Sequence, residues 1–402
     1  MTPSSLPPNV QVIDPQANAV LTTSYDRGAE EPAWYESSSA VSAKHSPEVV
    51  NLALSDSRVP VQPFVVYHDD FLKVLGPNPK LKLIAKNETY PFAHEAGVWI
   101  PSTREVFFTS NQFYGDSKHQ HRQIVISKIK LPEYSDTADD ADDVLYEWEN
   151  IAPHPPILSG NGGTNYEDGL LLCQQGSGLV PGALVYMNPK PPYTTRTILN
   201  NFYGRPFNAP NDVVVLPMDG SLWFTDPDYA QLQTLRRFQR LPNQVYCFQP
   251  KTGSVRMVAD GLTRPNGIAF SPDCSKCYVT DTEAYDGRGS NLAEAAATIY
   301  VLDVVEQISP SGELSFYLAN KRVFAFADCG APDGIKVDLA GNVYSGCGDG
   351  VHVWNPCGTL IGKILVPRGI ANFCFADPGV IILLNESRIF EMRCAAQGAL
   401  VR

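Results

Sequence analysis

Residues 211–228, NDVVVLPMDGSLWFTDPD, contain the pattern that decides the fold. An alternating apolar run leads into a Pro/Asp/Gly turn, and a second apolar run follows the turn and ends in Thr-Asp. Alternation with a period of two on both sides of such a turn is the signature of a β-hairpin. The stretch therefore predicts two antiparallel strands joined by a tight turn.

The same pattern returns five more times along the chain. The copies are GVWIPSTREVFFTSN (97–111), DGLLLCQQG (168–176), NGIAFSPDCSKCYVTDTEA (266–284), DGIKVDLAGNVYSGCGDG (333–350) and NFCFADPGVIILLNES (372–387). Hairpin repeats spaced by roughly 40 to 65 residues are typical of β-propeller blades, because radial closure protects the sheet edges. We therefore predict an all-β fold, a six-bladed β-propeller. A β-sandwich or two unrelated β domains are the alternatives, but neither explains the regular return of the motif.

The first 60 residues differ from the rest of the chain. They are rich in Pro, Ser and Ala and show little periodicity, whereas strand-like segments recur from about Phe64 onward. We expect residues 1–60 to form an N-terminal extension that packs on or covers the propeller. Residues 61–402 should form the six blades.

Composition limits the class of protein and its partners. The 402 residues are 44% hydrophobic and 18% charged, as in an ordinary globular protein. The formal net charge of −12 opposes the phosphate attraction that drives nucleic-acid binding. The N-terminal sequence has no basic or apolar leader region, and no apolar run is long enough to span a membrane. We expect a cytoplasmic protein without nucleic-acid or membrane partners, and the sequence leaves its oligomeric state open.

Several common catalytic motifs are missing from the sequence. It contains no G-x-S-x-G elbow, no phosphate-binding loop, no dinucleotide fingerprint and no H-E-x-x-H. The segment Cys274–Cys277 is a lone C-x-x-C on a predicted turn and lacks the second pair of a zinc ribbon. A candidate site must therefore come from the repeats themselves.

Polar residues at the starts of the repeats form that candidate site. They are Glu95, Asn211, Asn266 and Asp333. Because blades are related by rotation, equivalent positions converge on the central axis. Two carboxylates and two amide oxygens make a hard, all-oxygen ligand set, which suits calcium or another divalent cation. Asn-Asp, Asn-Gly and Asp-Gly also form turns and need no metal for that role, but Glu95 has no turn role and favours a metal site.

Four segments of the chain resemble one known family. They are HEAGVW (94–99), RPFNAPNDVVVLPMDGSLWFTDPDY (205–229), RPNGIAFSPDCSKCYVTDT (264–282) and APDGIKVDLAGNVYSGCGDGVHVWNP (331–356). From about residue 60 onward the chain resembles the senescence marker protein, gluconolactonase and luciferin-regenerating enzyme family, most closely its fungal lactonohydrolase branch. The resemblance implies that Glu95, Asn266 and Asp333 bind a divalent metal, Ca²⁺ by preference, with Asn211 beside it as a further ligand.

The resemblance also implies an activity. The metal would polarise a lactone carbonyl and lower the pKa of a bound water, and Asp333 would accept the proton of that water. Glu95 would be the second catalytic carboxylate, and ring opening would yield a hydroxy acid. The expected contacts to a small-molecule substrate at the channel mouth are Asn211, Arg205, Asp226 and Tyr229. An extended backbone would point His94 away from Glu95.

Two other functions fit the same scaffold. A biosynthetic pathway of fungal secondary metabolism could use the propeller to hold an apolar intermediate for a non-hydrolytic cyclisation, such as a hetero-Diels–Alder cycloaddition. A propeller can also serve as a protein-binding platform, which leaves Glu95 unexplained. Aligned carboxylates and amides favour hydrolysis, because a scaffold freed from metal chemistry has no chemical reason to keep them.

Overall fold

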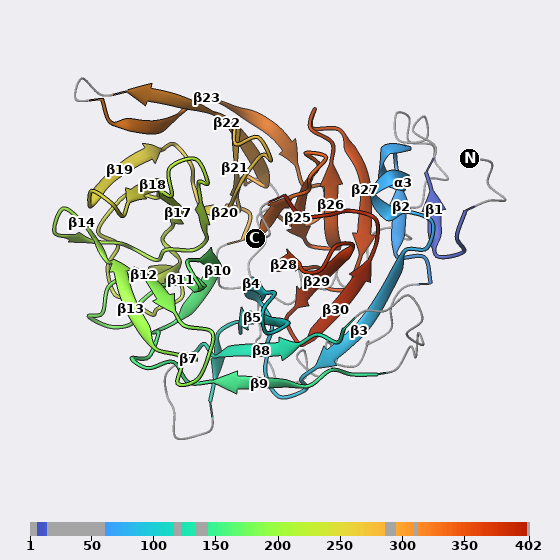
Figure 1. Ribbon diagram of the computed structural model, residues 1–402, viewed down its shortest axis with the longest axis horizontal. Coiled ribbons are helices and arrows are strands. Elements are labelled where there is room, and N and C mark those ends of the chain that lie inside the picture. Colours follow the sequence, from blue (N-terminus) through green and yellow to red (C-terminus); the bar gives the residue numbers. More distant parts are fainter. Residues whose placement is uncertain are drawn as a thin grey trace.

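The computed structural model describes residues 6–13, 61–115, 122–133, 144–285, 295–308 and 312–399. Six four-stranded antiparallel units surround a central axis (Figure 1), which confirms the predicted six-bladed β-propeller. The described helices, α3 (Asp70–Leu75) and α4 (Tyr229–Leu232), have one or two turns each. Neither of them is long enough to cross a membrane.

Each blade has four strands that run in order from the inner to the outer edge. Blade 1 contains β4 (Glu95–Ile100), β5 (Glu105–Thr109), β8 (Ile126–Lys130) and β9 (Trp148–Ile151). Blade 2 contains β10 (Gly160–Tyr166), β11 (Gly169–Gln174), β12 (Ala183–Met187) and β13 (Thr195–Leu199). Blade 3 contains β16 (Val213–Val215), β17 (Leu222–Asp226), β18 (Gln244–Gln249) and β19 (Ser254–Ala259).

The remaining three blades follow the same order. Blade 4 contains β20 (Pro265–Phe270), β21 (Lys276–Asp281), β22 (Thr298–Ile308) and β23 (Leu314–Phe326). Blade 5 contains β24 (Ile335–Val337), β25 (Val343–Cys347), β26 (Gly350–Trp354) and β27 (Leu360–Leu365). Blade 6 contains β28 (Asn372–Phe375), β29 (Val380–Asn385), β30 (Arg388–Arg393) and β3 (Lys80–Lys86). Two small hairpins lie outside the blades: β6 (Phe113–Tyr114) with β7 (Arg122–Gln123), and β14 (Asn201–Phe202) with β15 (Arg205–Pro206).

The second blade departs from the sequence pattern. The repeat read from residue 168 onward is β11, the second strand of its blade, and the inner strand is the preceding segment GNGGTNY. This strand was missed because it lacks apolar alternation. Its glycines meet neighbouring chain instead: a Cβ atom on Gly162 would lie 2.4 Å from the carbonyl oxygen of Asn211. Close approach between blades thus replaces side-chain packing at this point.

The N-terminal part of the chain closes the ring. β3 pairs antiparallel with β30 and becomes the outer strand of blade 6, so the first and last parts of the propeller share one sheet. β2 (Phe64–Val66) continues blade 5 beyond β27, and β1 (Val10–Val12) pairs in parallel with β2. The predicted extension thus contributes at least β1 to a blade edge, and residues 14–60 of it lie outside the described ranges.

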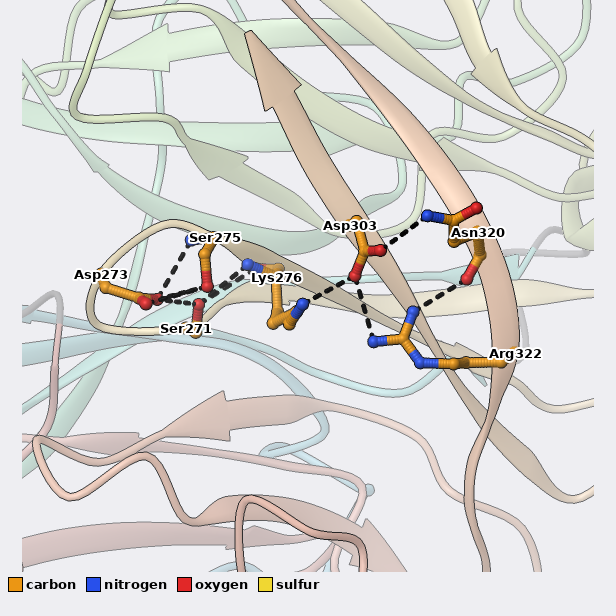
Figure 2. Close-up of polar contacts among 7 residues, drawn as sticks. All are labelled: Ser271, Asp273, Ser275, Lys276, Asp303, Asn320 and Arg322. Atoms are coloured by element: carbon orange, nitrogen blue, oxygen red, sulfur yellow. Dashed lines mark hydrogen bonds and ion pairs between the residues drawn. The ribbon is translucent and has the colours of Figure 1, made fainter.

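A polar network ties the long outer hairpin of blade 4 to the neighbouring strand. Asp303 on β22 is its centre (Figure 2), accepting hydrogen bonds from Lys276 Nζ at 2.7 Å, Asn320 Nδ2 at 2.9 Å and Arg322 Nη2 at 3.0 Å. The Lys276 bond, followed by the Asn320 bond, lowers the pKa of Asp303. The network lies where the register between β22 and β23 shifts, so it fixes the strands at their most irregular point.

Asp303→Asn should therefore reduce stability in a pH-dependent manner. The folded-state pKa lies below the unfolded value, so the carboxylate stabilises the fold above about pH 4 and this contribution disappears as the pH falls further. Urea denaturation at pH 7 should show a loss of about 0.5–1 kcal/mol, which shrinks towards pH 3. Glu306→Gln, an exposed change on the same strand, is the control. A loss of equal size at both pH values would contradict the charge-based explanation.

Candidate functional site

The four residues predicted from the repeats stand at one end of the inner strands. Glu95 opens β4, Asn266 is the second residue of β20, and Asn211 and Asp333 each precede an inner strand by two residues. Contacts join β4, β10, β16, β20, β24 and β28 into a closed ring. Closure of the ring therefore brings the starts of the inner strands together.

The site carboxylates lie close to each other and to a histidine. Oxygens of Glu95 and Asp333 and a ring nitrogen of His94 lie within 4.8 Å of one another. Burial raises the pKa of Asp333, and the neighbouring Asn266 side chain opposes this rise. Asn211 belongs to the blade before Asn266, and each amide side chain is almost fully buried.

A recurring threonine fixes the ligand positions from the neighbouring blade. The Thr225 hydroxyl, on the second strand of blade 3, donates to the carbonyl oxygen of Asn266 at 2.6 Å. The Thr280 hydroxyl, at the equivalent place in blade 4, donates to the carbonyl oxygen of Asp333 at 2.8 Å. Blades 3 and 4 thus each position the candidate ligand of the blade that follows.

The aspartate after each of these threonines accepts hydrogen bonds from the loop that leads into the inner strand of its own blade. The two oxygens of Asp226 accept hydrogen bonds from the backbone N–H groups of Asn208 and Ala209 at 2.9 and 2.7 Å. Asp281 in blade 4 accepts two backbone bonds in the same way, each of 2.8 Å. Burial raises the pKa of Asp226 to about 7 although these bonds oppose the shift. The expected contact of Asp226 with substrate therefore needs correction, because both of its oxygens position a loop.

The Asn-Gly and Asp-Gly pairs at the site are not turns. Asn266 and Gly267 lie within β20, and neither Gly267 nor Gly334 has a left-handed φ. A Cβ atom on Gly267 would lie 2.5 Å from the carbonyl oxygen of Asp333. The glycines allow neighbouring blades to approach at the ligand positions, which answers the turn-forming alternative raised by the sequence.

Three buried oxygen atoms at the site lack any hydrogen-bond donor among the described residues. They are Oδ1 of Asn211, Oδ1 of Asn266 and Oδ1 of Asp333. Leaving a buried polar atom unpaired costs about 1–3 kcal/mol, so native structures rarely contain three such atoms on neighbouring blades. All three are acceptors. A bound cation would satisfy acceptors of this kind, so the residues present fit a divalent metal.

The two carboxylates at the site, Glu95 and Asp333, also favour a bound positive charge. Glu95 is 2% exposed, and burial raises its pKa above the ordinary value. Burial also raises the pKa of Asp333, and the negative charge of Glu95 raises it further. Desolvated like charges destabilise each other unless a positive charge lies between them.

Asn372 is a residue of the site that the sequence analysis missed. It opens β28 in blade 6, is fully buried and donates from Nδ2 to Glu95 Oε2 at 2.7 Å. Its bond leaves the other oxygen of Glu95 available. The signal was present, because Asn372 begins the sixth repeat as Asn266 begins the fourth.

His94 departs from the orientation expected for extended backbone. It precedes β4, and its side chain lies with Glu95 and Asp333 because the alternation of the strand has not yet begun. Its Nδ1 lies 2.7 Å from Glu386 Oε1, and Asn111 Nδ2 donates to both oxygens of Glu386 at 3.2 Å. Burial lowers the pKa of His94, but the charge and hydrogen bond of Glu386, together with the charges of Glu95 and Asp333, outweigh burial and raise the pKa to about 10.

The two remaining predicted substrate contacts differ in position. Tyr229 on α4 is buried, and its hydroxyl interacts with the Asn266 side chain, so it borders the site. Arg205 on β15 is exposed, and its guanidinium donates to the carbonyl oxygen of Arg240 at 3.0 Å. Of these two, the structure connects only Tyr229 to a candidate ligand.

Comparison with known proteins places the chain in a family. A family model described as the SMP-30/Gluconolactonase/LRE-like region matches residues 162–384, more than half of the chain. The chain belongs to this family. The resemblance inferred from the four sequence segments is thereby confirmed.

Curated relatives in this family have names that denote lactone chemistry. Lactonohydrolase oryL of Aspergillus oryzae is 32% identical over 336 residues, which cover 78% of this chain and 70% of that protein. The gluconolactonase of Zymomonas mobilis is 29% identical over 194 residues, and the alignment covers 47% of this chain and 51% of that protein. Lactone hydrolysis is therefore supported at the level of the family.

Solved structures agree in fold. A gluconolactonase from Xanthomonas campestris has a TM-score of 0.58 at 23% identity, covering 82% of this chain and 93% of that one. A calcium-binding protein, regucalcin, from Agrobacterium tumefaciens has a TM-score of 0.51 at 15% identity, covering 79% of this chain and 96% of that one. At these identities the likeness shows the shared propeller.

Two matched substitutions test the unpaired oxygens. In buffer with EDTA, Asp333→Asn should increase the free energy of unfolding by ~1–2 kcal/mol, because it removes an unsatisfied buried charge. Asp226→Asn makes the same change at a fully buried site, but it should lose ~1–3 kcal/mol because its new amide faces backbone donors. Urea denaturation of both variants measures the difference. Equal losses in the two variants would contradict this account.

Proposed function

We propose that this protein is a divalent-metal-dependent hydrolase that opens a lactone ring to a hydroxy acid. The observation that carries the proposal is the set of three donor-free buried oxygens beside the buried carboxylate of Glu95. Membership in the SMP-30/Gluconolactonase/LRE-like family supports the reaction class. The all-oxygen donor set supports Ca²⁺ as the preferred ion.

Glu95, Asn211, Asn266 and Asp333 would hold the ion. When bound there, a divalent cation polarises the lactone carbonyl and lowers the pKa of an adjacent water. Asp333 offers an unpaired Oδ1 and accepts the proton of the attacking water as general base. Glu95 contributes negative charge while Asn372 holds its other oxygen. The water oxygen bonds to the acyl carbon, the acyl C–O bond of the lactone breaks, and the proton held by Asp333 passes to the ring oxygen, which leaves as the hydroxyl of the product.

The site rim supplies groups that orient the substrate. His94 is held through Nδ1 by Glu386 and carries a positive charge at neutral pH, so its Nε2–H can stabilise a negatively charged oxygen. The Tyr229 hydroxyl borders Asn266 and can hydrogen-bond a substrate hydroxyl. We keep Asn211 as a ligand with a substrate-facing role and assign no substrate contact to Asp226.

Acid release from a panel of small lactones tests the proposed reaction. Chelation should reduce the rate of the wild-type protein at least ~100-fold, and added Ca²⁺ should restore it. Glu95→Gln and Asp333→Asn should lose activity to a similar extent while remaining folded, since each removes one charge with little change of shape. Glu306→Gln is the exposed control.

Two results would oppose this function. Full hydrolysis by either site variant after metal removal would exclude the metal-dependent mechanism. Bound metal without hydrolysis of any lactone would instead favour the non-hydrolytic cyclisation considered from the sequence.

A further inference from the structure

The central channel continues beyond the candidate ligands as a small cavity. Its volume is about 90 Å³, and its lining includes residues from the inner strands of all six blades. Among the described residues that line it, Lys336 on β24 is the only charged one. Lys336 lies three residues after Asp333, which precedes the same strand, and it lines the cavity next to the site.

The C-terminal segment closes the far end of this channel. Ala399 N donates to Val337 O at 3.0 Å, and Leu339 N donates to Gln397 O at 2.8 Å. Gly398 and Ala399, the last residues that the structure describes, line the cavity. The Lys336 side chain is accordingly 24% exposed. Charges in such a partly enclosed channel are screened less than charges at the surface.

Lys336 acts on a third buried carboxylate. Its Nζ lies 3.9 Å from Asp212 Oδ2, and Asp212 is 1% exposed. Asp212 also accepts bonds from the N–H groups of Val213 and Ile268, at 2.9 and 3.3 Å. Burial raises the pKa of Asp212 and Lys336 opposes the shift; Lys336 likewise lowers the pKa of Glu95. The positive charge of Lys336 therefore interacts electrostatically with the candidate metal ligands.

The formal charges of three carboxylates at the site and of Lys336 add to −2. Glu95, Asp333 and Asp212 contribute three negative charges, and Lys336 contributes one positive charge. The His94–Glu386 pair at the rim is neutral as a pair, and Arg368 acts on Glu386 from outside it. A divalent cation neutralises this total. A trivalent cation would leave a positive charge in the enclosed channel.

We propose that Lys336 determines which cation charge the site selects, by cancelling Asp212 and leaving a net charge that matches a divalent ion. The inference rests on the proposed metal site and adds a specificity residue to it. Lys336 has no place among the ligands and acts through its field. Removing its charge should favour trivalent ions relative to divalent ones.

Four variants vary the charge in steps. Lys336→Met makes the total −3, Asp212→Asn makes it −1, and the double variant Lys336→Met/Asp212→Asn restores −2. Lys336→Arg keeps the charge and controls for the loss of the lysine itself. Lys251→Met removes an exposed lysine in the turn between β18 and β19 and controls for the overall charge of the protein.

Cation affinity is measured directly, without any substrate. Tb³⁺ binding is followed by its luminescence on excitation of tryptophan, since Trp99 lines the channel, and Ca²⁺ affinity is obtained by competition and by calorimetry. We expect the ratio of Tb³⁺ to Ca²⁺ affinity to rise about tenfold or more in Lys336→Met and to fall in Asp212→Asn. The double variant, Lys336→Arg and Lys251→Met should keep the wild-type ratio. Circular dichroism verifies that each variant is folded.

The outcomes separate this inference from the function on which it rests. If the wild-type protein binds Ca²⁺ but the ratio stays unchanged in Lys336→Met, Lys336 does not set selectivity and the metal site stands. If the double variant fails to restore the ratio while Lys336→Arg keeps it, the shift reflects something other than net charge, and the inference is wrong. If the wild-type protein binds neither ion, both the proposed metal site and this inference fail.

Discussion

The pairing of β3 with β30 is the constraint on which the rest of the structure depends. It recruits a strand from the N-terminal part of the chain into the last blade and thereby closes the ring. Only in a closed ring do the inner strands of all six blades begin around one axis. The convergence of Glu95, Asn211, Asn266 and Asp333 is a consequence of that closure, since these residues are widely separated along the chain.

Bringing these polar side chains together leaves some of their oxygens without a hydrogen-bond donor from the described part of the chain. Hydrogen bonds satisfy many other buried polar groups around the site: Asp226 and Asp281 receive backbone N–H groups, and Glu95 receives the Asn372 amide. The oxygens left without donors lie on three neighbouring blades. Such selective omission is typical of a binding site, where stability is lower than it could be.

The fold and most of the site could be predicted from the sequence because both depend on a repeated local pattern. Period-two alternation with turn residues identified the hairpins, and rotation related their polar first residues. β10 could not be found in this way, because its glycines pack against neighbouring backbone and leave no apolar signal. The roles of Asp226 and His94 depend on loops and on partners more than 15 residues away, which alternation does not encode. Asp212 of blade 3 and Lys336 of blade 5 are far apart in the sequence and come together only in the closed ring.

Because of the threonine contacts between blades, a candidate ligand is held in place by a residue of the preceding blade. Thr225 belongs to blade 3 but positions Asn266 of blade 4, and Thr280 of blade 4 positions Asp333 of blade 5. Blades 3 and 4 therefore each carry one candidate ligand and also a threonine, or clamp, that positions the ligand of the next blade. During divergence of duplicated repeats, a ligand and its clamp would have to be retained in adjacent copies. Exchange or deletion of either blade would disturb two ligand positions at once. At this site, two adjacent blades must therefore be retained together.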